Sequence, residues 1–386
     1  MEFGLDEEQL AIQALARDFG EAEIAPHAAE WSRERRFPKE LYAKLARLGL
    51  MGVCVPEELG GAGAGFLSYV LVLEELSRAD AGVGVTVAVH TSAATLPILR
   101  FGSEEQRQAL VPPLARGEKI GAFALTEAES GSDPASLTTR AEPDGDGWRI
   151  SGTKQWATNG GFAATVVLFA RAPAGISCFA LDGGAPGLTV SREAEKLGLN
   201  SSSTVDLVLE GVRAGRDRLL GAEGKGLSIA LATLDGGRIG IAAQAVGIAQ
   251  AAYDVARAYA LEREQFGRRI AEFQAIQWKL ADMATEIDAA RLLTYRAAWL
   301  RDRGEPHAEA GAKAKLFASS VARRQTGEAL QILGGYGYTT EFPVERYYRD
   351  ARVTEIYEGT SEMQRLVIAR SILGLGAKGN GDGART

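Results

Sequence analysis

The sequence predicts an α+β protein of several domains, with a helical N-terminal domain, a middle β domain and a helical C-terminal domain. The chain has 386 residues, which is long for a single hydrophobic core. The apolar pattern changes from helical to strand-like near Ile120 and becomes helical again at Leu227. These two changes place the expected domains at residues 1–120, 121–228 and 229–386.

The first domain is expected to be made of helices. Apolar residues recur at helical spacing in three segments, 10–19, 41–48 and 66–78. Ser103 and Gln106 have the spacing of a capping box, so we expect a helix to begin after Ser103. The stretch Ala81–Leu99 carries no charged side chain but is rich in Gly, Thr and Ser, which predicts a buried helix rather than a membrane span.

Short runs of β-branched and aromatic residues, separated by Gly, Pro and Asp turns, predict a β-sandwich or β-barrel in the middle domain. The runs are 123–126, 148–152, 166–170, 176–181, 188–191 and 204–209. Two later apolar stripes, Ile239–Ala256 and Ile276–Leu293, predict Ala-rich helices that pack as an antiparallel bundle. We expect the glycine-rich tail from Gly374 to be loosely ordered.

Composition argues against several classes of protein. The net charge is −7 and Lys and Arg do not cluster beside aromatics, so no nucleic-acid surface is expected. The two cysteines, Cys54 and Cys178, and the three histidines lack metal-ligand spacing, so no metal site is expected. The acidic N-terminus has no export signal, and the few cysteines suit a reducing cytosol, which predicts a cytoplasmic protein.

Three glycine-rich stretches do not fit the common nucleotide-binding motifs. The segments 60–65 and 334–337 do not follow a strand, and 221–226 lacks the Ser or Thr of a P-loop. A cofactor must therefore be held by a site other than a Rossmann unit or a P-loop.

Two loops at strand ends combine hydroxyl and aromatic side chains. One reads Phe123-Ala-Leu-Thr-Glu-Ala-Glu-Ser-Gly-Ser-Asp and the other Trp156-Ala-Thr-Asn. Each alone is more often an ordinary turn, with the Trp in the core. As a functional site, Thr126, Ser132 and Thr158 would hydrogen-bond a flat heterocycle or a phosphate.

Two further segments carry charged residues beside glycine. Asp235-Gly-Gly-Arg238, at the expected start of a long helix, reads most simply as an ion pair three residues apart. Each glycine costs a helix roughly 1 kcal/mol relative to alanine, which suggests that a group approaches the backbone closely here. In Ile356-Tyr-Glu-Gly-Thr-Ser-Glu, Glu358 is either a solvated carboxylate or, in an apolar pocket, a base with a raised pKa.

Together and in this order, the segments resemble the acyl-CoA dehydrogenase family over essentially the whole chain. The resemblance implies a helical domain, a β-barrel and a four-helix bundle that bind FAD. It places Thr126 against the flavin ring together with Phe123 and Leu125, and Trp156 and Thr158 along the same ring. Ser132 would lie near the pyrophosphate and the CoA moiety.

The resemblance also implies a homo-oligomer, a tetramer, in which a neighbouring subunit contributes to the ADP half of FAD. The contributing residues would be Arg263, Phe266, Gln274, Gln331, Gly334 and Gly335. Thr360 and Glu362 would lie near the cofactor. Asp235, Arg238 and Gly359, with Ser132, would bind the acyl-CoA.

The implied reaction is an α,β-dehydrogenation in fatty-acid β-oxidation. Glu358 would remove the α-proton of a saturated acyl-CoA while the β-carbon passes a hydride to the flavin, giving the trans-2-enoyl-CoA. The backbone N–H of Glu358 and a ribityl hydroxyl would polarise the thioester carbonyl. Electrons would pass to an electron-transfer flavoprotein. The later segments look most like short-chain, butyryl-type members, which favours a short- to medium-length straight acyl chain.

Two positions depart from relatives. Ala128 follows Glu127 where many relatives have proline, and Gly237 stands where the isovaleryl branch carries its base, so Glu358 is the matching base. Three alternatives stay open: an oxygen-using acyl-CoA oxidase, a non-catalytic flavin-binding scaffold and a helical structural protein without a cofactor. Turnover with oxygen alone would favour the first, and a protein that takes up no FAD would contradict any flavin enzyme.

Overall fold

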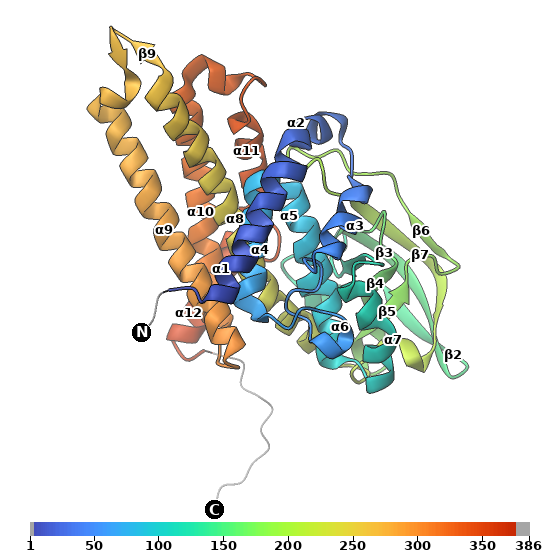
Figure 1. Cartoon of the computed structure of the whole chain (residues 1–386). Coiled ribbons are helices and arrows are strands. Elements are labelled where there is room, and N and C mark those ends of the chain that lie inside the picture. The colour runs from blue at the N-terminus through green and yellow to red at the C-terminus, as the bar shows by residue number, and fades with distance from the viewer. Residues whose placement is uncertain (1–3, 376–386) are drawn as a thin grey trace, which may run out of the picture.

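A computed structural model describes residues 4–375 (Figure 1). The expectation of a loose glycine-rich tail falls mainly on residues 376–386, which lie outside the described part of the chain. From the N-terminus, helices precede a β-sheet, and further helices follow it. This order confirms the predicted fold class.

The N-terminal helices pack against the C-terminal ones. Their bounds are α1 (Glu7–Phe19), α2 (Ala25–Glu34), α3 (Lys39–Arg47), α4 (Gly65–Ala79), α5 (Ala81–Ala88), α6 (Leu96–Phe101) and α7 (Glu104–Ala115). The predicted capping box at the start of α7 is confirmed, because Ser103 and Gln106 each accept a hydrogen bond from the other's backbone N–H, at 3.3 and 2.8 Å. One hydrophobic core joins α4 and α5 to the later helices.

Two helical stretches are long and apolar enough, by length and composition, to cross a membrane. They are Ala81–Phe101, which includes the π-helical turns of Val89–Thr95, and Gly226–Glu262. Of their most apolar windows, 94% and 78% are buried inside the protein. Both are therefore accounted for as core helices, as predicted for the first.

The middle of the chain forms a mixed sheet in the order β6-β7-β3-β2-β4-β5-β8, with β1 parallel to β4. The strands are β1 (Gly121–Ala124), β2 (Arg140–Asp144), β3 (Gly147–Thr158), β4 (Thr165–Ala172), β5 (Gly175–Asp182), β6 (Leu188–Val190), β7 (Thr204–Ala214) and β8 (Leu219–Leu220). The register of β3 against β7 shifts between Lys154 and Ala157. This bulge re-aims the side chain of Trp156.

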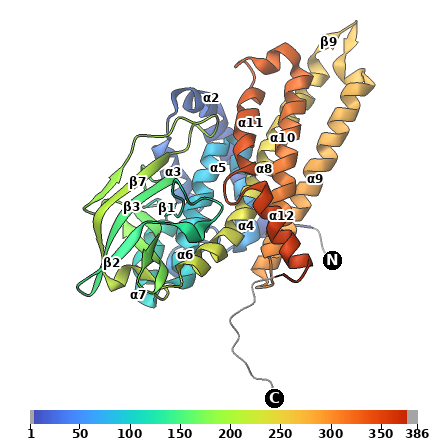
Figure 2. The ribbon, with the colours of Figure 1, turned by 180° about the vertical axis from the view of Figure 1, so that it is seen from behind.

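The C-terminal helices are α8 (Gly226–Glu262), α9 (Gln274–Asp302), α10 (Ala308–Leu333), α11 (Val344–Ala351) and α12 (Ser361–Ile372). The three long ones stand side by side, with a small hairpin of β9 (Glu264–Gln265) and β10 (Arg268–Arg269) at one end (Figures 1 and 2). The prediction that Asp235 opens a helix is wrong, because α8 begins at Gly226. Ile229 and Ala230 are buried against the sheet, and this packing extends the helix toward its N-terminus.

Candidate active site

Glu358 lies in a short turn between the last residues of a 3-10 helix, Arg352–Glu355, and α12. Its φ is 53° and that of Gly359 is 88°, so two successive residues adopt the left-handed backbone conformation, which is unfavourable for residues other than glycine. The Gln364 amide donates to the carbonyl oxygens of Glu358 and Gly359, at 3.3 and 2.7 Å. Lys315 Nζ donates to the Gly359 carbonyl at 2.5 Å. These bonds hold a turn that the backbone alone would not favour.

The Glu358 carboxylate lies against the backbone of α8. A Cβ at Gly237 would come within 2.5 Å of Glu358 Oε2. Oε2 is buried and has no hydrogen-bond partner among the described residues. Burial raises the pKa of Glu358 to about 6, while the positive charges of Lys315 and Arg238 act in the opposite direction. A carboxylate with a free oxygen and a pKa close to neutral can act as a general base.

The Asp235–Arg238 pair is formed, with 2.6 Å between its charged atoms. Arg238 is buried, and burial raises the pKa of Asp235. The two glycines between them allow other side chains to approach the helix backbone: Gly236 faces the Arg301 guanidinium and Gly237 faces Glu358. The expectation of a close approach to the backbone is therefore confirmed.

A second group of predicted residues lies where β1 and β3 end. Phe123 packs edge-on against Phe169, Leu125 is buried and Thr126 is half-buried. Trp156 is 60% exposed with a φ of 60°. The prediction of a core Trp does not hold here: the bulge turns the indole outward. Thr158 ends β3 half-buried, and Ser132 is exposed in the loop after β1.

Backbone and side-chain hydrogen bonds join these two strand ends. The Gln155 N–H donates to the Thr126 carbonyl at 2.8 Å, and Lys154 Nζ donates to the Leu125 carbonyl at 3.0 Å. The buried Asn159 amide donates to the carbonyls of Thr86 and Gly121, tying β3 to α5 and β1. Thr126, Trp156 and Thr158 therefore belong to one hydrogen-bonded edge of the sheet.

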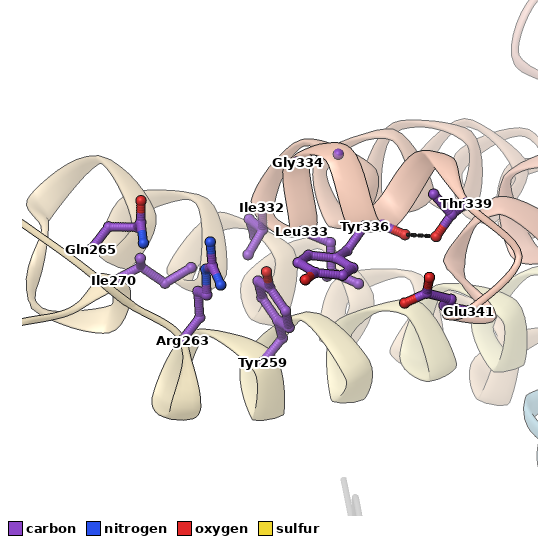
Figure 3. A pocket seen from close by; sticks show the side chains of 11 residues that line it. Tyr259, Arg263, Gln265, Ile270, Ile332, Leu333, Gly334, Tyr336, Thr339 and Glu341 are labelled. Atoms are coloured by element: carbon purple, nitrogen blue, oxygen red, sulfur yellow. Dashed lines mark hydrogen bonds between the residues drawn. The ribbon is translucent and has the colours of Figure 1, made fainter.

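The third group lies at the far end of the bundle. Arg263 caps α8, and with Gly334 and Gly335 it lines a pocket of about 510 Å³ that also contains Tyr259 and Tyr336 (Figure 3). The Arg263 guanidinium lies 5.7 Å from the centre of the Tyr336 ring. The remaining members of the group are exposed nearby in sequence: Phe266, Gln274 and Gln331.

The Glu358 turn and the Arg263 pocket are far apart within one chain. Gly237, beside Glu358, and Arg263 are at opposite ends of a helical stretch that spans about 39 Å at the usual rise per residue. Of the remaining residues, Thr360 is the N-cap of α12 and Glu362 is exposed in its first turn, both next to Glu358. The predicted residues thus form a base cluster, a strand-end cluster and a distant pocket.

Two residues at the base cluster were not singled out from the sequence. Lys315 lies on the buried face of α10, together with residues such as Ala312, Ala318 and Ala322. A lysine at an apolar position of the helical pattern could therefore have indicated it from the sequence. Gln364 is completely buried in α12, and its position relative to Glu358 is visible only in the fold. Among the described residues, no three His, Cys, Asp or Glu side chains are grouped so as to hold a metal ion.

Comparison with known proteins finds the same family in all three parts of the chain. Models of the acyl-CoA dehydrogenase N-terminal, middle and C-terminal domains match residues 6–118, 122–212 and 224–373. The short-chain specific acyl-CoA dehydrogenase, mitochondrial, of Bos taurus is 50% identical over 374 residues, which cover 96% of this chain and 91% of that protein.

Solved structures show the same likeness. Butyryl-CoA dehydrogenase from Megasphaera elsdenii superposes with a TM-score of 0.95 and 43% identity, over 97% of this chain and 100% of that one. A chain from the structure named for the electron transferring flavoprotein of Acidaminococcus fermentans gives 0.96 and 46%, with the same coverage. The chain belongs to the acyl-CoA dehydrogenase family of FAD-dependent oxidoreductases.

Proposed function

We propose that this enzyme oxidises short, straight-chain acyl-CoA thioesters to trans-2-enoyl-CoA, with Glu358 as the base that removes the α-proton. The observation that carries the proposal is the Glu358 carboxylate, whose Oε2 is buried, lacks a partner among the described residues and lies against Gly237. Its pKa of about 6 leaves it ionised at neutral pH but more basic than a solvated carboxylate.

The residues present fit FAD. An indole held outward in a left-handed conformation offers a flat apolar face, and Thr126 and Thr158 beside it offer hydroxyls. The distant pocket pairs the Arg263 guanidinium with two tyrosine rings, which suits a nucleotide with its phosphates. When bound, FAD supplies the acceptor for the hydride that leaves the β-carbon. The other assigned cofactor residues, Phe123, Leu125, Ser132, Phe266, Gln274, Gln331, Gly334, Gly335, Thr360 and Glu362, are part of this proposal.

The turn that presents Glu358 also offers a donor to the substrate. The N–H of Glu358 makes no hydrogen bond to another described residue, whereas the N–H groups of Ile356 and Tyr357 donate to the Val353 carbonyl. We assign the free N–H to the thioester carbonyl, where it would stabilise negative charge as the α-proton leaves. Gly359, Asp235, Arg238 and Ser132 would bind the rest of the acyl-CoA.

The packing beyond Gly237 supports a short acyl chain. One turn further along the same face of α8, a Cβ at Gly240 would meet Leu73 at 3.2 Å and the Tyr69 hydroxyl at 3.3 Å. One turn beyond that, the buried Gln244 binds the Tyr357 hydroxyl and donates to the Ala81 carbonyl at 2.7 Å. An acyl chain that starts at Glu358 and follows α8 therefore meets the hydrogen-bonded side chains of Gln244 and Tyr357 within about 10 Å.

We also propose a homotetramer that passes electrons to an electron-transfer flavoprotein. Large apolar side chains are exposed along one side of α9, Trp278, Leu292 and Trp299, as is Phe266 beside it. Such a stripe is typical of a subunit interface. The likeness to a chain from the flavoprotein structure of Acidaminococcus fermentans supports the acceptor.

We also propose the bounds of the three domains and the location of the protein in the cell. The domains 1–120, 121–228 and 229–386 are supported by the change from helix to strand at Gly121 and back to helix at Gly226. A cytoplasmic location is supported by Cys54 and Cys178, which are both free.

An anaerobic titration of the FAD-loaded enzyme with butyryl-CoA tests the function. We expect the visible absorbance of the flavin to bleach, because Glu358 can take the α-proton as the hydride leaves. Glu358→Gln should retain flavin and bleach about 10²- to 10⁴-fold more slowly. A yellow wild-type protein that is not bleached would exclude butyryl-CoA as substrate, and Glu358→Gln at the wild-type rate would remove Glu358 from its role.

A further inference from the structure

Lys315 is a buried lysine with an unusual set of partners. Its side chain is 1% exposed within α10, and its Nζ donates to the backbone carbonyl of Gly359. It forms no ion pair with a described carboxylate, although a buried ammonium group is normally paired. The charge of Lys315 is therefore directed at the turn that carries Glu358 rather than at a side chain in contact with it.

We infer that Lys315 is a positioning residue for the base: its hydrogen bond fixes the Glu358–Gly359 turn, and its positive charge keeps the Glu358 carboxylate ionised without touching it. This inference rests on the proposed function of Glu358. It makes the reactivity of the base depend on a residue of helix α10, 43 positions earlier in the chain.

The hydrogen bond has a definite structural task. Glu358 and Gly359 both have positive φ, and for Glu358 this conformation is unfavourable unless the surroundings impose it. The Gly359 carbonyl accepts from both Lys315 and Gln364, so two donors from two helices converge on one oxygen. Both donors bind the backbone, which leaves the carboxylate free to accept a proton.

The charge has a second task. Burial raises the pKa of Glu358, and the positive charge of Lys315 is the strongest influence in the opposite direction, followed by that of Arg238 on α8. Conversely, burial lowers the pKa of Lys315 to about 8, and the negative charge of Glu358 opposes this most strongly. The other titratable groups that act on the pair are Glu355 and Glu362, near Lys315, and the buried Tyr69 and half-buried Tyr357, near Glu358. At neutral pH both Lys315 and Glu358 are charged and stabilise each other.

The test compares two neutral substitutions with a matched control. Lys315→Met removes the charge and the donor, whereas Lys315→Gln removes the charge and keeps a donor. Lys313→Met is the control, because Lys313 lies on the same helix, has a side chain that is 42% exposed and pairs with Glu309. For each FAD-loaded protein, the rate of anaerobic flavin reduction by butyryl-CoA is measured from about pH 5 to pH 9, on both sides of the expected midpoint.

In the wild type the rate should rise with pH through a midpoint near the Glu358 pKa of about 6, because only the ionised base accepts the proton. Both Lys315 variants should move this midpoint to higher pH by about one unit or more, the usual effect of losing a nearby opposite charge. Lys315→Met should also lose about tenfold in the rate at high pH, since misplaced catalytic groups react slowly. Lys315→Gln should retain most of that rate, and Lys313→Met should follow the wild type.

A Lys315→Met profile with an unmoved midpoint overturns the inference, even if the rate falls, because a purely structural role would lower the rate alone. If Lys315→Met does not fold, as judged by its melting temperature and flavin content, Lys315→Gln provides the same test of the midpoint.

A measurement without substrate separates this inference from the proposed function. The infrared band of the protonated Glu358 carboxyl is identified by its loss in Glu358→Gln and is titrated in the wild type and the Lys315 variants. A higher midpoint in the variants supports the inference even if butyryl-CoA does not reduce the flavin. Equal midpoints overturn it even if butyryl-CoA does.

Discussion

At the scale of single residues, the reactive carboxylate depends on the absence of a side chain on the facing helix. Gly237→Ala would place a methyl group 2.5 Å from Glu358 Oε2, so the carboxylate must move. We expect flavin reduction to slow by about 10²-fold, the effect of a displacement of roughly 1 Å in an active site. Stability should not fall in proportion, because alanine favours a helix over glycine by about 1 kcal/mol. Single-turnover rates and thermal unfolding measure the two effects.

Gly327→Ala is the matched control for this prediction. Gly327 lies within α10, where a Cβ meets only the Tyr348 ring, at an ordinary 3.7 Å. This variant should gain stability and reduce its flavin at the wild-type rate. A Gly237→Ala enzyme with wild-type rates would show that the carboxylate does not need its place beside α8.

Only some residues of the Glu358 site could be predicted from the sequence. Glu358 was singled out as a base through the resemblance of Ile356-Tyr-Glu-Gly-Thr to the family's base motif, and the two glycines after Asp235 correctly indicated a close approach. The partners that hold Glu358 could not be predicted in the same way. Lys315 and Gln364 bind the Glu358–Gly359 turn because α10 packs against α12. The local sequence does not indicate which turn a buried lysine will contact.

At the scale of elements, a buried ion pair joins the two strand ends assigned to the flavin. Lys154 of β3 and Glu127, after β1, lie 2.7 Å apart, and both are buried. Glu127 also accepts from the N–H groups of Thr138 and Thr139. Burial acts to raise the pKa of Glu127, but these donors, with Lys154 foremost, outweigh it and lower the pKa to about 2. The pair therefore fixes Thr126 relative to Trp156.

Lys154→Met should leave the Glu127 charge buried without its partner and destabilise the protein by about 3–5 kcal/mol. Flavin content should fall as well, because the two strand ends lose their link. The double variant Lys154→Met with Glu127→Gln removes the stranded charge and should recover part of the stability. Denaturant unfolding and flavin per subunit provide the measurements. A double variant no more stable than Lys154→Met would contradict the role given to the charge.

Some helices and strands could be predicted from the sequence and others could not. Strands with continuous apolar runs, such as β4 and β5, were predicted within a few residues. Strand β2 was missed because it is polar and contains Pro143, and it forms through its pairing with β3. The π-helical turns of Val89–Thr95 were not expected either, since every residue there is buried, polar and apolar alike, and the segment therefore has no polar face opposite an apolar one.

At the scale of the whole molecule, the base cluster and the Arg263 pocket are too far apart along α8 to serve one cofactor within a single chain. A site shared between neighbouring subunits resolves this separation, and mixed oligomers can test it. Glu358→Gln subunits lack the base and Arg263→Ala subunits should lose FAD, so each alone should be inactive. In a mixed pair that shares its sites, one site combines the intact Glu358 of one subunit with the intact Arg263 of the other.

Coexpression of the two variants with different tags, followed by purification on both tags, should therefore restore activity to about half of the sites in each mixed pair. Flavin content should recover with the activity, because the restored site binds FAD through the intact Arg263. If each subunit instead holds its own cofactor, every site in the mixed oligomer carries one of the two defects and no activity returns. Recovery would thus assign Arg263 to the neighbour's cofactor, whereas no recovery would contradict a site shared between subunits.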